Sequence, residues 1–466
     1  MARQRSAVLL VACVSLLVAG CGARWTSAQR ASVEARGKGG GATASSTKSG
    51  SGGASATTTP GGATSGGSAT GGGGGAGGTA TGGGTDSAGG AAASGPKPCA
   101  APSDAPGVTN DTITIGNIST LTGPIPGLGA SAVGAVRSYI AYRNANGGVC
   151  GRQIVMKTAD DGADNGQFRA LLEDMAPSIL GLVGTNGAGD AGGTDVVEAQ
   201  HIPVVATAFN DAFQNASTVF DMNPPPPDLH AVTPKYKYLY DQGVRKASII
   251  TLATAPSQAQ LDLQQSLMEA AGIQIVNRQL LPLSTLSFDS AARGVANSGA
   301  DYLFFLSAAS QDASMAQSMK DTGYQGLKYS EYLTAYGSNF IELAGAAAEG
   351  ATSWSRSLPN EEPNSTPEQT NYLQWFAQTA PDLFPDTFAA DAWASGKAFF
   401  DALEQLSGPI SRDALIAQLK TYKSFDAGGL EGTIDLADKI SNGCFIAMKV
   451  EGGVWKRETP SQGFLC

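Results

Sequence analysis

The chain has 466 residues, a formal net charge of −10 at pH 7 and six cysteines. An acidic chain without a basic stripe is not expected to bind nucleic acid. Its length is too great for one ordinary core, and the part that can fold suits two lobes of usual domain size. After residue 21, no stretch is long and apolar enough to predict a transmembrane helix.

Residues 1–21 have the pattern of a secretion signal. Arg3 and Arg5 form the charged start, and the apolar run at 7–20 is short for a membrane span. The run ends in small residues before Cys21, which resembles the bacterial lipobox, so we expect Cys21 to be lipidated. The alternative is a plain signal in which Cys21 is incidental. A lipidated N-terminus would be anchored to a membrane surface without spanning it.

Residues 22–98 are predicted to be a disordered tether. Between 37 and 95 the chain is almost entirely Gly, Ser, Thr and Ala, with no apolar periodicity from which a core could form. As a random coil, about 75 residues have an r.m.s. reach of roughly 45–50 Å. That reach suits a tether that holds a domain away from a membrane; a structural role in the cell wall is the alternative.

Four cysteines follow the tether. An even number in an exported protein predicts two disulfides, and three pairings are possible. Cys99 lies shortly before the first predicted strand and Cys150 just before the second. Parallel neighbouring strands begin at the same sheet edge, which favours Cys99–Cys150; Cys444–Cys466 would then join the C-terminal tail to a late strand. No CxxC pair or histidine cluster indicates a metal site, and we expect none.

The stretch 112–157 organises the folded part. A β-branched strand at 112–118 is followed by a turn cluster at 119–129, a helix at 130–146 and a second strand at 153–157. Strand, helix and strand in this order form a βαβ unit and predict a parallel sheet. The loop at the carboxyl end of the first strand is where such sheets bind small ligands.

The same alternation continues to residue 223 and is repeated after it. Four prolines at 224–227 cannot lie in the centre of a sheet and mark a lobe boundary. The predicted fold class is α/β, with two doubly wound parallel-sheet lobes joined by a hinge. Lobe 1 is predicted at 99–226 and 353–430, lobe 2 at 227–352, and the hinge return with a C-terminal hairpin at 431–466. Expected helices in the later part include 229–242, 338–348, 366–379, 387–406 and 411–422.

The residues offer little for catalysis, and we expect a protein that is not an enzyme. Only two histidines occur, His201 and His230, and no G-x-S-x-G, HExxH or P-loop lysine motif is present. Residues 187–192 do match G-x-G-x-x-G after a strand, with Asp211 about twenty residues on. The motif follows the third strand of the lobe instead of the first, so no cofactor is expected. An exported nucleotide-cofactor oxidoreductase remains an alternative, and the same backbone N–H groups could hold an anion such as a ligand carboxylate.

Several short motifs occur in an order and spacing typical of one family. They are ITIG at 113–116, LTGP at 121–124, NANGGV at 144–149, DD at 160–161, IPVV at 202–205, and AG with AEG at 344–350. Over about 112–455 the chain resembles the substrate-binding lipoproteins of ABC transporters, in the branched-chain amino acid (leucine-binding-protein-like) group with the type I periplasmic-binding-protein fold. The resemblance implies two lobes on three hinge strands that close on a ligand, and a closed form that a membrane permease recognises.

The resemblance also places the ligand contacts on six loops. In the first lobe they are Leu121–Leu128, Gly187–Gly189 and Thr207–Phe209, and in the second Pro256–Gln258, Ser307–Ala309 and Leu333–Tyr336. The residues assigned to ligand binding are Leu121, Thr122, Gly123, Leu128, Gly187, Ala188, Gly189, Thr207, Ala208, Phe209, Ser257, Ser307, Thr334 and Tyr336.

The sequence departs from this family in the second lobe. Amino-acid binders of the group place an acidic residue there for the ligand ammonium, but Leu333 or Thr334 falls at that position. Glu331 and Asp312 are near in sequence but not in register. A buried ammonium without a carboxylate partner is poorly compensated, so a neutral or purely anionic ligand is an alternative to an amino acid.

Together these features predict an extracytoplasmic solute-binding lipoprotein on the outer face of the cell membrane. It would capture a small molecule, an amino acid or a related compound, and deliver it to an ABC importer as a monomer. A ligand sensor of the same fold that signals through a membrane partner is the alternative.

Overall fold

The computed structural model describes residues 98–125, 127–228, 230–337 and 339–466. The predicted signal, lipidated Cys21 and tether therefore lie outside the described residues, apart from Pro98. Within the described ranges, no helix has the length and apolar character needed to cross a membrane.

The first lobe is built on a five-stranded parallel sheet with the order β2-β1-β3-β4-β5. From β1 the chain passes to β2 on one side, and β3 then pairs with β1 on the other side. Connections of opposite direction leave a crevice at the carboxyl ends of β1 and β3, the usual ligand position in such sheets. The strands are β1 Thr112–Ser119, β2 Gln153–Asp160, β3 Leu182–Val183, β4 Val204–Ala206 and β5 Val219–Asp221.

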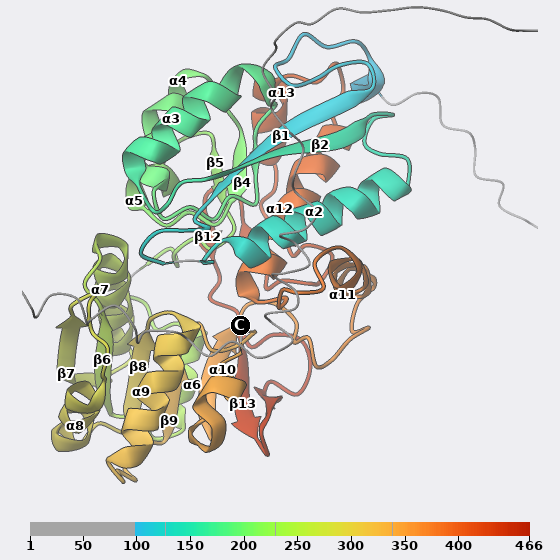
Figure 1. Ribbon diagram of the computed structural model, residues 1–466. Coiled ribbons are helices and arrows are strands. Elements are labelled where there is room, and N and C mark those ends of the chain that lie inside the picture. Colours follow the sequence, from blue (N-terminus) through green and yellow to red (C-terminus); the bar gives the residue numbers. More distant parts are fainter. Residues whose placement is uncertain (1–97, 126, 229, 338) are drawn as a thin grey trace, which may run out of the picture. The chain divides into compact units, whose positions relative to one another are not determined.

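Helices cover both faces of this sheet (Figure 1). Val183 and Val205 belong to the core under α2, α11, α12 and α13, whereas the adjacent Leu182 and Val204 belong to the core under α3, α4 and α5. This alternation follows from the period of two in a strand. The helices are α2 Ala130–Ala145, α3 Asn165–Met175, α4 Thr194–Ala199, α5 Asp211–Gln214, α11 Pro367–Thr379, α12 Thr387–Glu404 and α13 Arg412–Leu419.

The second lobe has a seven-stranded sheet with the order β14-β13-β10-β9-β8-β6-β7. Five strands are parallel, and the C-terminal hairpin adds two antiparallel strands beside β10. Two doubly wound lobes are therefore confirmed. The strands are β6 Lys246–Leu252, β7 Gln274–Leu281, β8 Tyr302–Leu306, β9 Tyr329–Tyr332, β10 Ala351–Ser355, β13 Ile446–Glu451 and β14 Val454–Thr459.

The position of β10 differs from the predicted lobe boundary, which assigned residues from 353 onward to lobe 1. All five residues of β10 are buried, and it pairs with β9 on one side and β13 on the other. A strand that is buried throughout needs partners at both edges, and only the second sheet supplies them. The hairpin likewise belongs to that sheet and is not a separate appendage.

Two helices of the second lobe are shorter than the sequence predicts. The helix expected from 229 begins at Pro234, because proline suits the first helical position and disfavours helix in the residue before it. The helix expected at 338–348 ends at Ala344, since Gly345 has a φ of 55°. The helices are α6 Pro234–Asp241, α7 Ala255–Ala270, α8 Asp289–Ser298, α9 Ala309–Asp321 and α10 Phe340–Ala344.

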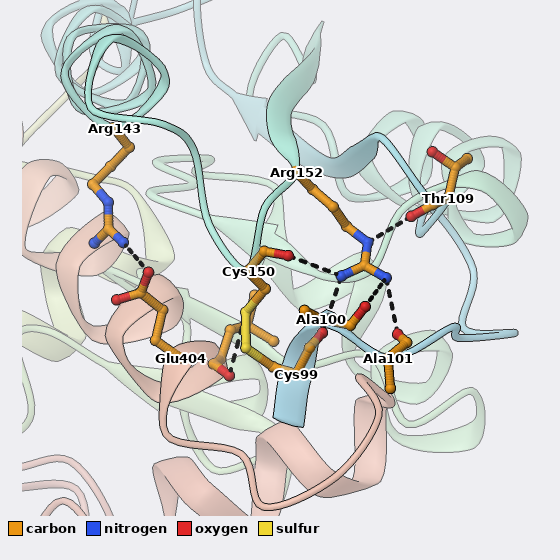
Figure 2. The surroundings of a disulfide bond; sticks show 9 residues. Cys99, Ala100, Ala101, Thr109, Arg143, Cys150, Arg152 and Glu404 are labelled. Atoms are coloured by element: carbon orange, nitrogen blue, oxygen red, sulfur yellow. Dashed lines mark hydrogen bonds and ion pairs between the residues drawn. A yellow bond between two sulfur atoms is a disulfide. The ribbon is translucent and has the colours of Figure 1, made fainter. Parts of the chain in front are cut away.

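A disulfide and a buried arginine fix the N-terminal arm of lobe 1, which is the segment 98–111 before β1 (Figure 2). Cys99 is bonded to Cys150, the pairing that the sequence favours, and Cys444 is bonded to Cys466. Arg152, 2% exposed, donates to the carbonyl oxygens of Cys99 at 3.0 Å, Ala101 at 2.9 Å and Thr109 at 2.6 Å. Because these acceptors come from the arm, the guanidinium ties it to the start of β2.

The chain passes between the two sheets three times: after β5, after β10 and before β13. Arg356, just after β10, contacts the other two connections. Its Nη1 donates to the carbonyl oxygen of Met222 at 2.5 Å, and its own carbonyl oxygen accepts from the Gly432 N–H at 2.7 Å. One residue therefore joins all three connections.

Candidate ligand-binding loops

The six loops assigned to ligand binding fall into two groups by sheet order. Those of lobe 1 follow β1, β3 and β4, which are adjacent, and those of lobe 2 follow β6, β8 and β9, also adjacent. Since the strands within each group are parallel, their carboxyl ends meet at one sheet edge. The structure therefore brings the predicted residues of each lobe together at one edge of its own sheet.

The loop after β1 is shaped by the carboxylate of Asp160 at the end of β2. Its Oδ1 accepts from the N–H groups of Leu121 at 2.9 Å, Thr122 at 3.2 Å and Gly162 at 3.0 Å, and its Oδ2 accepts from the Thr122 hydroxyl at 2.6 Å. Desolvation opposes ionisation, but the hydrogen bonds outweigh it and lower the pKa of Asp160 to about 2. The carboxylate is thus already well supplied with donors.

The adjacent Asp161 organises the loop after β3. Its Oδ2 accepts from the Gly189 N–H at 2.9 Å, and its Oδ1 accepts from the Thr120 hydroxyl at 2.6 Å. The same hydroxyl oxygen accepts from the Ala188 N–H at 2.9 Å. These two amides therefore donate to acceptors inside the protein, and the expectation that this loop holds a ligand carboxylate stays a prediction.

The glycines of the G-x-G-x-x-G motif have a packing explanation. A Cβ atom at Gly187 would lie 2.7 Å from the Asp161 carboxylate, and one at Gly189 would lie 2.5 Å from the Asp164 carbonyl oxygen. A short 3₁₀ helix, Asp190–Gly193, follows the motif, and Asp211 is exposed at the start of α5. The close approach of backbone and carboxylate accounts for glycine here without a bound pyrophosphate.

Two more buried carboxylates hold the loop after β4. The Ala208 N–H donates to Asp221 at 3.0 Å and the Phe209 N–H to Asp190 at 2.7 Å. Burial raises the pKa of Asp190 to about 7, against the opposing effect of its hydrogen bonds, and burial also raises the pKa of Asp221. The Thr207 hydroxyl donates to Asp391 on α12 at 2.9 Å.

Asp391 links this loop to the inter-lobe connections. Both of its carboxylate oxygens accept from Nη2 of Arg356, at 2.9 and 2.8 Å. Asp221 and Glu431 also interact electrostatically with this arginine, and burial raises the pKa of Glu431 well above its usual range. Three carboxyl groups therefore share one arginine at the point where the connections meet lobe 1.

The loops of lobe 2 are held in the same way. The Ser257 N–H donates to the Thr254 hydroxyl oxygen at 3.2 Å, which caps α7. The Ala308 N–H donates to Gln311 at 3.2 Å, and the Ser307 hydroxyl donates to the same amide oxygen at 2.5 Å. These loops are therefore also bonded internally.

The two acidic residues near the expected ammonium site are both buried. Asp312 is 0% exposed and accepts from the Thr334 N–H at 3.2 Å; burial raises its pKa well above the usual range. Glu331, also 0% exposed, pairs with Lys235 at 2.7 Å and accepts from the Tyr302 hydroxyl in the core of the lobe. The structure does not present either group at the surface of the loops.

Tyr336, assigned to the ligand, is 5% exposed. Its hydroxyl donates to Glu361 at 2.8 Å and accepts from the Asn360 N–H at 2.8 Å. Both partners lie on the connection after β10. The hydroxyl therefore joins a loop of lobe 2 to that connection, an interaction that the sequence did not predict.

Apolar side chains are partly exposed at the carboxyl ends of the lobe 1 strands. Leu121, Leu128, Ala188 and Phe209 are each half-buried, and the Phe209 ring lies 5.9 Å from that of Phe388 on α12. Gly123, which lies in the same loop as Leu121 and Leu128, is exposed. These side chains offer apolar surface to a ligand at the carboxyl ends of the lobe 1 strands.

A surface groove of about 730 Å³ lies at the other end of the lobe 1 sheet. Its walls include 102–106, 199–201 and 409–413, next to the amino end of β4. His201 and Asp413 form an exposed pair there, 2.7 Å apart. Because ligands of such sheets bind at the carboxyl ends of strands, this groove is not the candidate site. No group of three or more His, Cys, Asp or Glu residues in the described ranges could hold a metal ion.

The sequence did not identify the carboxylates that organise the loops. Asp160, Asp161 and Asp221 do carry a recognisable signal, since each lies at the end of a strand or directly after it. Asp391 and Arg356 carry none, because their partners are distant in the chain. Their role follows only from the packing of α12 against β4 and the connections.

Comparisons with known proteins agree with this architecture. A family model described as periplasmic binding protein matches residues 112–454. A search of curated proteins finds no match.

Solved structures share the fold at low sequence identity. The chain is similar to a fatty acid ABC transporter substrate-binding protein from Thermomonospora curvata, with 18% identity, a TM-score of 0.65, and coverage of 78% of this chain and 94% of that chain. The chain is also similar to a leucine-binding protein from Thermotoga maritima, with 16% identity, a TM-score of 0.60, and coverage of 74% of this chain and 98% of that chain. A third similar structure is an R. palustris solute-binding protein in complex with 4-hydroxybenzoate. It has 17% identity, a TM-score of 0.60, and coverage of 75% of this chain and 96% of that chain. At such identities the likeness shows the fold alone.

Proposed function

This chain belongs to the periplasmic binding protein family, and on that premise we propose that it is an extracytoplasmic solute-binding lipoprotein of an ABC importer. It captures a small molecule between its two lobes, closes on it and delivers it to the permease as a monomer. The matched family and the named structures are binding proteins, and no catalytic step is proposed. The structural relatives carry ligands as different as leucine and 4-hydroxybenzoate in their names, so they do not identify the ligand of this chain.

One observation carries the proposal. In each sheet the candidate loops follow adjacent strands and lie together at the carboxyl ends of those strands, and three connections join the two lobes. Three connections allow a hinge motion that brings two such edges together on a ligand. The lobe boundaries that we propose are 99–226 with about 356–445 for lobe 1, and 227–355 with the terminal hairpin for lobe 2.

The test is native mass spectrometry of the full chain, searched for a co-purified small molecule, followed by a melting-temperature screen against a broad metabolite library. A bound molecule that raises the melting temperature supports the proposal. A folded protein that binds no metabolite in either experiment contradicts it. The lipid anchor is tested separately, by labelling with radioactive palmitate, which should be incorporated in the native chain and lost in the Cys21→Ala variant.

A further inference from the structure

Nine backbone amides of the six candidate loops donate to side chains of the protein. In every loop at least one N–H group donates to a side chain of the same lobe, and in four loops the acceptor is a carboxylate. The amides are those of Leu121, Thr122, Ala188, Gly189, Ala208, Phe209, Ser257, Ala308 and Thr334, and their acceptors are Asp160, Thr120, Asp161, Asp221, Asp190, Thr254, Gln311 and Asp312.

This arrangement disfavours an anionic ligand. A bound carboxylate is normally held by free backbone N–H groups or by an arginine. Here six of these nine loop amides donate to the protein's own carboxylates, and the other three donate to Thr120, Thr254 and Gln311. Arg356 is held by both oxygens of Asp391 and by the carbonyl oxygen of Met222. A ligand anion would also meet the like charge of Asp160 and Asp161.

A cationic or zwitterionic ligand is disfavoured as well. Asp161 and Asp312 are 0% exposed, and Asp190 is 1% exposed. The half-buried Asp160 already accepts four hydrogen bonds, three of them at Oδ1. An ammonium group placed at these loops would lose its hydration, which is costly in an apolar site. Oδ1 of Asp312 has no hydrogen-bond partner but is buried, and the exposed Glu361 already accepts from the Tyr336 hydroxyl.

The same loops do offer apolar surface. Leu121, Leu128 and Phe209 are half-buried at the lobe 1 edge, and Phe209 lies beside Phe388. Sites of this kind bind ligands mainly through apolar contact, with a few polar groups to orient them. Remaining lone pairs on loop oxygens can accept from an uncharged donor such as an amide or a hydroxyl group.

We infer that the ligand is an uncharged molecule with an apolar body, and is neither a free amino acid nor a carboxylate. This inference rests on the proposed function and specifies its ligand. The inference departs from the amino acid ligand that the sequence resemblance suggests: the fold is shared with amino-acid binders, but loop amides donate to side chains of the protein, and Asp161, Asp190 and Asp312 are buried.

The test compares four ligands that share a phenylalkyl body and differ in charge. They are 3-phenylpropanamide (neutral), 3-phenylpropanoate (anion), 2-phenylethylamine (cation) and L-phenylalanine (zwitterion), titrated calorimetrically into the full chain at pH 7. We expect the amide to bind at least about tenfold more tightly than each charged ligand. Equal or tighter binding of any charged ligand overturns the inference.

Two variants test the apolar contact. Phe209→Ala should weaken binding of the amide by about tenfold. Val155→Ala, which removes an exposed apolar side chain from β2, is the matched control and should leave the affinity unchanged. If none of the four ligands binds at millimolar concentration, the inference that the ligand has an apolar body is overturned. The proposed function fails on a different result, the absence of any small molecule that co-purifies with the chain or stabilises it.

Discussion

At the scale of single residues, hydrogen-bonded carboxylates organise the candidate loops of lobe 1. Asp160, Asp161, Asp190 and Asp221 each accept loop amides, and Asp391 connects the loop after β4 to Arg356. Such groups are stable only when they are hydrogen-bonded, because a buried charge without partners is strongly destabilising. These hydrogen bonds therefore link the backbone of each loop to a neighbouring strand or loop of the same lobe.

Replacing Arg356 should show how much this network contributes. In Arg356→Met the carboxylate of Asp391, only 2% exposed, loses its one cationic partner, and we expect a loss of about 3–5 kcal/mol in the free energy of unfolding. Arg356→Lys should recover only part of it, since an ammonium lacks the second nitrogen with which the guanidinium also binds the Met222 carbonyl oxygen. The measurement is urea unfolding followed by tryptophan fluorescence.

The matched control is Arg169→Met. Arg169 forms exposed ion pairs with Asp195 and Glu173, and its loss should leave the free energy of unfolding nearly unchanged, because solvent screens such pairs. An Arg356→Met protein as stable as this control would show that the network at the connections contributes little.

At the scale of elements, the N-terminal arm of lobe 1 is attached to the sheet by a disulfide and by an arginine side chain. The disulfide Cys99–Cys150 joins it to the turn before β2, and Arg152 binds its carbonyl oxygens (Figure 2). The arm follows directly on the predicted tether. We interpret this double attachment as the means by which the tether is joined to the sheet without loosening β1.

The two disulfides should differ in their effect on stability. Chain entropy predicts a loss of about 4 kcal/mol for Cys99→Ala/Cys150→Ala and about 3 kcal/mol for Cys444→Ala/Cys466→Ala, because the first bond closes a loop of 51 residues and the second a loop of 22. Urea unfolding of both double variants checks the order. A first variant with wild-type stability, or a peptide map without a 99–150 link, would contradict it.

At the scale of the whole molecule, the raised carboxyl pKa values set the pH dependence of stability. The pKa of Asp190 is about 7 and that of Asp386 about 6, both raised by burial. A carboxyl group with a raised pKa in the folded state stabilises the protein fully below its unfolded pKa, and this contribution is lost as the pH rises through the folded pKa. Asp160, with a pKa of about 2, acts in the opposite sense, and its contribution is lost only as the pH falls toward 2.

The free energy of unfolding should therefore be greatest near pH 4–5 and fall by at least about 2 kcal/mol between pH 5 and pH 8. Asp190→Asn should flatten this slope between pH 6 and pH 8, because its side chain no longer titrates. The exposed Asp195→Asn is the control and should leave the slope unchanged. Stability that rises with pH over this range would refute the expectation.

The sequence by itself determined the local pattern. Alternating strands and helices, the loop at the end of 112–118, the proline boundary and the even cysteine count were enough to predict two doubly wound lobes and the disulfide pairing. These features depend on residues close in sequence, or on the one rule that parallel strands share an edge. The positions of the candidate loops also followed from this rule, but the hydrogen-bond partners of their amides did not.

Only the tertiary structure decided how the loop amides are used. Asp160 meets Leu121, and Asp391 meets Thr207 and Arg356, because β2 lies beside β1 and α12 packs against β4. The second sheet likewise takes up β10 and the hairpin through pairings that span about a hundred residues. Such contacts depend on which distant segments become neighbours. Local sequence pattern carries no information on that choice, which is why it predicted where the candidate loops lie but not which side chains accept from their amides.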